Sequence, residues 1–365
     1  MFETTETFRT EGSGYVQHRI PVVCVTAAGS VLVFAEARRT RSDWGDIDIL
    51  MRRSVDGGRT FGDAQSVAYW PGEIPRDPFM QRHDHTGQAG RTHSNSVAIA
   101  DTNGAVHLIF CIEYRRAFYR RSDDDGLTWS DPADITSAFE VLRDHYPWRV
   151  IATGPSHGVQ LRSGRLLTPF WASRGSDGPG GDHHPSIVSS LYSDDDGATW
   201  RSGDIVANET DPAKDPNETS AVELPDGRVL FNMRNESERR RRLTATSPDG
   251  ATRWAAPVFD EALVEPICHA GLVRAGNDLY FSNPSPQELS PPLPVSRWMP
   301  RKNLVVRMSC DFGCSWPIAK AIDPGDAGYS DMNALPDGTL LCAYEIGGAR
   351  HILARFDRDW LTPGA

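Results

Sequence analysis

The feature that most constrains the fold is a short segment that recurs six times along the chain. Each copy is a turn glycine followed by a mostly apolar run typical of a β-strand. The copies are GSVLVFAEAR at Gly29, GAVHLIFCIE at Gly104, GRLLTPFW at Gly164, GRVLFNMR at Gly227, GNDLYFSNP at Gly276 and GTLLCAYE at Gly338. Strand-rich repeats spaced by roughly 50 to 75 residues are typical of β-propellers. We therefore predict an all-β fold, a six-bladed β-propeller of four-stranded antiparallel blades.

A second repeat, Ser-x-Asp-x-Gly-x-x-aromatic, begins at Ser54, Ser122, Ser193 and Ser309, with a degenerate copy at Ser247. Each copy follows a β-type run, so it stands where an outer hairpin must turn. Glycine supplies the positive φ, Asp and Ser hydrogen-bond the neighbouring backbone, and the aromatic residue anchors the turn. We expect these turns to be structural and none of their aspartates to lie in a site.

Nothing in the pattern divides the chain into separate domains. The Pro-rich stretch 284–300 and the segment 173–185 are predicted to be loops, and neither is long enough to link two independent cores. Residues 1–365 are therefore interpreted as one propeller domain. The last strand-like run, HILARFDRDWL from His351, could pair with an N-terminal strand and so close the ring.

Charge and composition exclude several classes of protein. The formal net charge of -11 disfavours nucleic acid and anionic membranes as partners. No apolar stretch approaches the roughly 18 residues that a membrane span needs, and the N-terminus lacks a signal-peptide pattern. A cytoplasmic protein is the expectation, and a secreted protein without its leader would look the same. The six cysteines include no C-x-x-C pair, which favours free structural thiols.

Charged residues end three of the repeat strands: Arg38, Arg234 and Glu345. In a propeller the ends of the innermost strands converge on the central axis, so such residues are candidates for a site. A single charged residue of this kind could simply cap its strand in water. Its recurrence at equivalent places in several blades favours a site.

Five segments, taken in chain order, resemble the motifs of the sialidases. They are HRIP (18–21), SDWGDIDILMRRS (42–54), DPNETSAVELPDGRVLFNMRN (215–235), RKNLVVRMS (301–309) and GYSDMNALPDGTLLCAYE (328–345). The resemblance covers nearly the whole chain. It implies a retaining exo-glycosidase that removes a terminal α-linked 2-keto sugar acid, such as sialic acid, from a glycan or glycoconjugate, without a cofactor or metal.

The resemblance also implies roles for individual residues. Arg19, Arg234 and Arg301 would form an arginine triad, with Arg38 close by, and Glu345 would steady Arg19. Tyr329 would be the nucleophile, paired with Glu218, and Asp43 the acid/base.

This set makes chemical sense. Arginine forks suit a carboxylate, which lies on the anomeric carbon of such a sugar, and a neutral tyrosine avoids the repulsion that an attacking carboxylate would meet. A nearby carboxylate can take the tyrosine proton during attack.

Each assignment has an alternative. Asp46 and Asp48 compete with Asp43, although Asp43 fits the family register and Asp48 alternates with isoleucines as a strand residue does. Arg297 and Arg307 compete with Arg301. Tyr329 could be a core tyrosine and Glu218 a loop carboxylate.

Two polar loops carry histidines: His83, Asp84, His85 and His93 in the first, and His183 and His184 in the second. They lack metal-ligand spacing, so we expect them to form the rim of a pocket. The run 236–242, ESERRRR, is interpreted as a solvated face or loop.

The chain also departs from the family pattern. His18 stands where tyrosine is common, and RTHSNSVAI lacks the usual Gly-Asn-Pro character. The sugar therefore stays open among N-acetylneuraminic acid, KDN and Kdo. Transfer instead of hydrolysis also stays open, as in a trans-sialidase, and so does a non-catalytic propeller that binds sugar acids.

Overall fold

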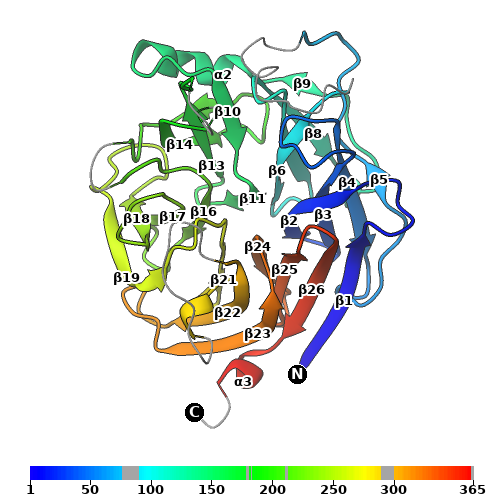
Figure 1. Ribbon diagram of the computed structural model, residues 1–365, viewed down its shortest axis with the longest axis vertical. Coiled ribbons are helices and arrows are strands. Elements are labelled where there is room, and N and C mark those ends of the chain that lie inside the picture. The colour runs from blue at the N-terminus through cyan, green and yellow to red at the C-terminus, as the bar shows by residue number, and fades with distance from the viewer. Residues whose placement is uncertain (76–89, 178–180, 182, 210–212, 289–299, 363–365) are drawn as a thin grey trace.

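The computed structural model describes residues 1–75, 90–177, 181, 183–209, 213–288 and 300–362. Six antiparallel sheets stand around a central axis, and the chain passes through them in order, as the colours of Figure 1 show. The prediction of a six-bladed β-propeller is confirmed. His83, Asp84, His85, Arg297 and most of the Pro-rich loop lie outside the described residues.

Each blade contains four main strands. They are consecutive in the chain in four blades; in the third blade β11 and β12 intervene after the first strand, and the last blade takes its outer strand from the N-terminus. From the axis outward, the first three blades are β2 (Gln17–Val25), β3 (Val31–Arg38), β4 (Ile47–Ser54) and β5 (Gln65–Ser66); β6 (His93–Ala100), β7 (Val106–Ile112), β8 (Arg116–Ser122) and β9 (Ala133–Asp134); and β10 (Val150–Thr153), β13 (Leu166–Ser173), β14 (Ser186–Ser193) and β15 (Arg201–Ser202). The other three are β16 (Thr219–Glu223), β17 (Val229–Met233), β18 (Arg241–Ser247) and β19 (Val258–Val264); β20 (Gly271–Ala275), β21 (Asp278–Pro284), β22 (Lys302–Ser309) and β23 (Ile318–Asp326); and β24 (Ser330–Ala334), β25 (Leu340–Ile346), β26 (Arg350–Phe356) and β1 (Phe2–Arg9).

Two blades carry an additional short strand near the axis. β11 (Ser156–His157) runs parallel to β6, and β12 (Val159–Gln160) pairs with β13. The described helical segments are short: α2 (Ser137–Glu140), η1 (Val141–Asp144), η2 (Pro286–Glu288) and α3 (Arg358–Leu361). No described helix is long and apolar enough to cross a membrane.

The ring is closed by pairing the two ends of the chain. β1 runs antiparallel to β26, with Phe2 opposite Phe356 and Arg9 opposite Arg350. Beyond the ladder, the rings of Phe2 and Trp360 stack at 4.6 Å. The predicted pairing of the C-terminal run with an N-terminal strand is confirmed, and it covers an edge that would otherwise be exposed.

The glycine-led repeats form the second strand of each blade, not the innermost one. The innermost strands are those that precede them, such as β2, β16 and β24. The expectation that Arg38, Arg234 and Glu345 end innermost strands is therefore wrong. Their strands are buried all the same, because each lies between two neighbours of its own sheet and against the next blade.

The Asp-type turns connect the third and fourth strands of their blades, as predicted. In the first, Ser54 donates to Asp56 at 2.7 Å and accepts from the backbone N–H of Gly58 at 2.8 Å, while Asp56 accepts from the N–H of Thr60 at 2.9 Å. Gly58 has φ +86°, which favours glycine. The same bonds recur at Ser122, Ser193, Ser247 and Ser309.

A buried carboxylate joins three of the innermost strands at the axis. Asp331, at the start of β24, is 0% exposed. One oxygen accepts from the backbone N–H of Val23 in β2 and of His157 in β11, each at 3.0 Å. The other accepts from His157 Nδ1 at 2.9 Å and from the N–H of Met332 at 2.9 Å. Asp331 therefore connects the first, second and last blades.

The six cysteines form no disulfide; four are buried, and Cys310 and Cys314 are exposed. The expectation of free thiols is confirmed.

Candidate active site

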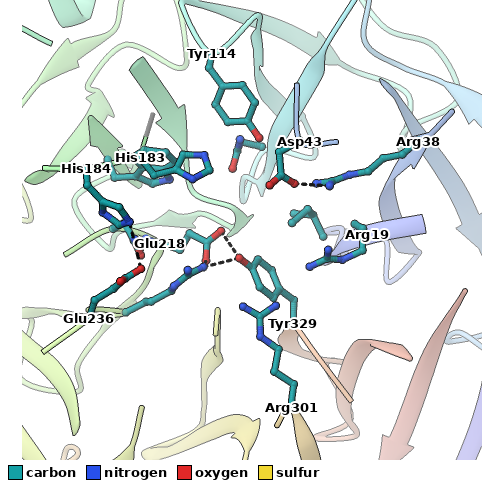
Figure 2. Close-up of a pocket in the computed structure, with 15 residues that line it drawn as sticks. Arg19, Arg38, Asp43, Tyr114, His183, His184, Glu218, Glu236, Arg301 and Tyr329 are labelled. Carbon is teal, nitrogen blue, oxygen red and sulfur yellow. Dashed lines mark hydrogen bonds and ion pairs between the residues drawn. The ribbon is translucent and has the colours of Figure 1, made fainter. Parts of the chain in front are cut away.

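A cavity of about 200 Å³ lies among the strand ends near the axis. Seven of the eight predicted site residues line it: Arg19, Arg38, Asp43, Glu218, Arg234, Arg301 and Tyr329. Figure 2 shows the polar ends of those that it labels pointing toward one space. The eighth, Glu345, stands behind Arg19. Residues that are far apart in the sequence are thus gathered by the ring.

Glu218 and Arg234 face each other because they extend the β16–β17 hairpin by one residue pair. The N–H of Arg234 donates to the carbonyl of Glu218 at 2.9 Å, and an Arg234 Nη1 donates to Glu218 Oε2 at 2.5 Å. Tyr329, just before β24, points at both. Its hydroxyl donates to Glu218 Oε1 at 2.7 Å and accepts from Arg234 Nη1 at 2.6 Å. The phenol, the carboxylate and the guanidinium form a closed cluster (Figure 2).

The charges and burial of this cluster determine which of its groups are protonated at neutral pH. Burial raises the pKa of the Tyr329 phenol well above 10, although Arg234 pulls it down. Burial also favours neutral Glu218, but the adjacent Arg234, together with His269 and the hydrogen bond from Tyr329, holds the pKa of Glu218 below its ordinary value. At neutral pH the site therefore holds a neutral tyrosine hydrogen-bonded to an ionised glutamate.

Arg19 reaches the cavity from β2 through an irregular backbone. The β2–β3 register shifts between Arg19 and Val22, and Ile20 has φ +58°, which is unusual and strained for a β-branched residue. Glu345 in β25 secures this turn. It accepts from Arg19 Nε at 2.8 Å and from the N–H of Ile20 at 3.2 Å. Burial opposes ionisation of Glu345, but Arg19 keeps its pKa below the ordinary value.

Three guanidinium groups surround the Tyr329 ring. The central carbons of Arg301, Arg19 and Arg234 lie 5.1, 5.4 and 6.0 Å from its centroid. Arg301, immediately before β22, donates through Nη2 to the carbonyl of Ile267 at 2.6 Å. Within the described part of the chain, the two terminal nitrogens of Arg19 donate to no protein group, so they can serve a ligand. The guanidinium groups of these three arginines could contact an anionic group beside Tyr329 from three directions.

Asp43 lies beside Arg38, in the loop between β3 and β4 (Figure 2). Its side chain is 46% exposed in the cavity and pairs with Arg38. Enclosure within the cavity, away from bulk water, favours the protonated acid, but Arg38, with His183 and Arg19, holds the pKa of Asp43 well below its ordinary range. Asp43 is therefore ionised at neutral pH.

Arg38 is held from behind by Glu36, a residue that the sequence did not suggest. Glu36 is fully buried and accepts from Arg38 Nη2 at 2.6 Å and Nε at 3.1 Å. Its other oxygen accepts from the N–H of Asn95 at 2.8 Å. Glu36 and Arg38 share one face of β3 because they are two residues apart, and this period-two spacing could have revealed the pair.

The alternatives weighed from the sequence lie elsewhere. Asp46 and Asp48 pair with Arg39, and Arg307, which lies on β22, contacts Glu288 and Ser285. None of these lines the cavity. Geometry therefore places Asp43 and Arg301 at the cavity instead of these rivals.

The wall facing the arginines is aromatic and polar. Trp44 packs on Tyr114 at 4.4 Å, and His183 stacks on Trp44 at 5.5 Å. His184 lies 3.4 Å from Glu236 (Figure 2). The expectation that His183 and His184 rim a pocket is confirmed. Sequence reasoning missed Tyr114 and Glu236, which no motif marks.

His93 behaves differently from the other histidines. It is buried in β6, and its Nδ1 contacts the carbonyl of Ile47 at 2.9 Å. Among the described residues, no group of three or more His, Cys, Asp or Glu side chains could hold a metal ion.

The interpretation of 236–242 as a solvated face is wrong for part of the run. Arg239 is exposed and pairs with Glu261, but Arg242 is entirely buried against Glu265. The strand alternation of β18 turns this side chain inward, and a buried carboxylate compensates its charge.

Comparison with known proteins agrees with this geometry. Residues 76–342 match the family described as BNR repeat-like domain. A sialidase of Micromonospora viridifaciens is 33% identical over 95% of this chain and 52% of its own length, and an exo-alpha-sialidase of Aspergillus fumigatus is 25% identical over 97% and 87%.

Solved structures share the fold. A Hadza microbial sialidase superposes with a TM-score of 0.76 at 21% identity, covering 95% of this chain and 67% of its own. The intramolecular trans-sialidase from Ruminococcus gnavus superposes with a TM-score of 0.74 at 16% identity, covering 99% of both chains.

The fold and the repeats thus define a propeller of the BNR-repeat class. Within that class, the chain belongs to the sialidase family. It spans about half the length of the Micromonospora relative.

Proposed function

We propose that this protein is a retaining exo-glycosidase that hydrolyses a terminal α-linked 2-keto sugar acid, of which sialic acid is the first candidate. The observation that carries the proposal is the Tyr329 hydroxyl, 2.7 Å from ionised Glu218 and surrounded by Arg19, Arg234 and Arg301. The names of the relatives support the substrate class.

The arginines orient the sugar. Its carboxylate is attached to the anomeric carbon, so binding that group between Arg19, Arg234 and Arg301 brings the anomeric carbon over the tyrosine that they surround. Planar guanidinium forks fix a carboxylate in two directions, which lysines would not do.

Tyr329 then attacks the anomeric carbon while its proton passes to Glu218. The hydrogen bond for this transfer exists before substrate arrives. Arg234, which already donates to the phenol oxygen, stabilises the negative charge that develops there. The product of the step is a tyrosyl-sugar intermediate.

Asp43 protonates the departing oxygen and later takes a proton from the attacking water. Tyr329 and then water each attack the anomeric carbon with inversion, which gives net retention. At neutral pH Asp43 is ionised, since Arg38 and its cationic neighbours hold its pKa down. The bound sugar carboxylate adds a negative charge beside Arg19, which moves the pKa of Asp43 upward toward that of a working acid.

A propeller that only binds sugar acids would need the arginines but not the Tyr329–Glu218 hydrogen bond, so the geometry favours catalysis. The test is release of 4-methylumbelliferone from its α-glycosides of N-acetylneuraminic acid, KDN and Kdo. Turnover of one identifies the sugar. Binding of a free sugar acid without turnover of any glycoside would reject catalysis.

Replacing Asp43 with alanine should have an effect that depends on the leaving group. Methylumbelliferone departs readily without a proton, whereas a sugar hydroxyl does not. We expect kcat/KM to fall by about 10²- to 10⁴-fold for a sialyl-lactose substrate and by much less for the aryl glycoside. Equal losses on both substrates would contradict the acid role. Asp46→Ala, outside the cavity, is the matched control.

A further inference from the structure

A buried ion pair lies behind the candidate site, in the arginine-rich run that the mechanism does not use. Arg242 in β18 donates through Nη1 to Glu265 Oε2 at 2.6 Å, and both side chains are 0% exposed. Arg242 Nε donates to Asn232 Oδ1 at 2.6 Å, and its Nη2 to the Asn232 carbonyl at 3.1 Å. The guanidinium is thus bonded on every side without touching the cavity.

The same pair holds the segment 265–270, which connects β19 to β20. Arg242 Nη1 donates to the carbonyl of Cys268 at 3.0 Å, and Glu265 Oε1 accepts from the N–H of Cys268 at 3.0 Å. The ion pair therefore fixes both the N–H and the carbonyl of Cys268.

This segment supports the candidate site directly. The carbonyl of Ile267 accepts from Arg301 at 2.6 Å, and Cys268 packs with Tyr329 and Ile20 in one buried cluster. Ile267 has φ +56°, a conformation that costs on the order of 1 to 3 kcal/mol and persists only when its surroundings impose it. The bonds to Cys268 hold the residue that directly follows it.

Desolvation makes a buried ion pair a poor source of stability, and well-packed apolar residues often replace one without loss. Its bonding to the 265–270 segment suggests a different role. We propose that Arg242 and Glu265 are positioning residues, which fix the segment 265–270 and thereby aim Arg301 at the substrate carboxylate. This inference rests on the proposed function of Arg301.

The first test uses the double variant Arg242→Met with Glu265→Leu, which removes both charges. Misplacing a binding group by about 1 Å can cost 10²-fold, so we expect kcat/KM to fall roughly 10- to 100-fold at a temperature where the variant is fully folded. The melting temperature should also fall, because buried groups of Asn232 and Cys268 lose their hydrogen-bond partners. The control is Arg355→Met with Glu3→Leu, a pair on the last blade far from the cavity. It should leave kcat/KM unchanged.

A mutant cycle separates positioning from general damage. In an Arg301→Ala background the double variant should cause little further loss, because the group that it aims is already absent. In an Arg19→Ala background the losses should multiply. Multiplying losses in both backgrounds would overturn the proposal.

The second test does not depend on activity. With Cys310 and Cys314 changed to serine, the remaining four thiols are buried. Labelling by a thiol reagent, followed by peptide mass spectrometry, should show Cys268 reacting at least about 10-fold faster in the double variant, with Cys24, Cys111 and Cys342 unchanged. Continued protection of Cys268, or equal exposure of all four, overturns the proposal. If the wild type turns over no sugar acid, the proposed function fails, and the labelling still decides whether the pair holds the segment.

Discussion

Phenylalanine in place of Tyr329 is expected to lower kcat for a sialyl-lactose substrate on the order of 10³-fold, with a much smaller change in KM. The substitution removes only the hydroxyl that donates to Glu218 and accepts from Arg234. The ring remains packed among the three arginines, so carboxylate binding survives. The variant should therefore lose catalysis while it still binds the sugar acid. Steady-state kinetics, with calorimetric titration of the free sugar acid, measures both.

The matched control is Tyr344→Phe. Tyr344 is equally buried and donates to Asp323 at 3.1 Å, but it lies in β25 away from the cavity. Its loss should leave kcat unchanged. A Tyr329→Phe protein that keeps more than about a tenth of wild-type kcat would exclude tyrosine as the nucleophile.

Alanine in place of Asp331 is expected to give the largest loss of stability. The change removes four hydrogen bonds, three of which connect β24 to β2 and β11, and it leaves the buried N–H groups of Val23 and His157 without this acceptor. Unsatisfied buried donors and a broken buried network cost roughly 3 to 5 kcal/mol. The melting temperature should fall by roughly 4 to 7 °C for a chain of this size.

Asp123→Ala is the comparison for this variant. Asp123 is also a carboxylate paired with a basic residue, Arg121, but it is exposed in an Asp-type turn. Its removal should change the free energy of unfolding by less than about 0.5 kcal/mol. A similar, small effect at Asp331 would mean that the axis does not depend on that carboxylate.

The repeats made the propeller predictable because most blades contain the same short sequence pattern. A turn glycine, an apolar strand and an Asp-type turn recur with enough regularity to count blades and place the closing strand. The same repetition hides the order of strands within a blade. Nothing in GRVLFNMR marks it as the second strand, since burial on both faces looks alike for either position.

The cavity residues that lie in family-like sequence motifs could be predicted from those motifs. Arg19, Asp43, Glu218, Arg301 and Tyr329 stand in segments resembling those of one family, and all five line the cavity. Glu36, Tyr114 and Glu265 stand outside such motifs. Their roles come from side chains that the fold brings together, such as Arg242 beside Glu265, and a burial pattern in one strand does not reveal its partners. The arginine run 236–242 shows the difficulty, because a charged sequence suggests solvent while Arg242 is buried.

Chemical trapping of the intermediate shows directly whether Tyr329 attacks the sugar. A 2,3-difluorinated sugar acid slows the second step more than the first, so the attacking residue stays attached to the sugar. Proteolysis and mass spectrometry of the inactivated protein should find the sugar on the peptide containing Tyr329, with no label in Tyr329→Phe. A label on Glu218 or Asp43, or turnover with inversion and no covalent species, would contradict the account.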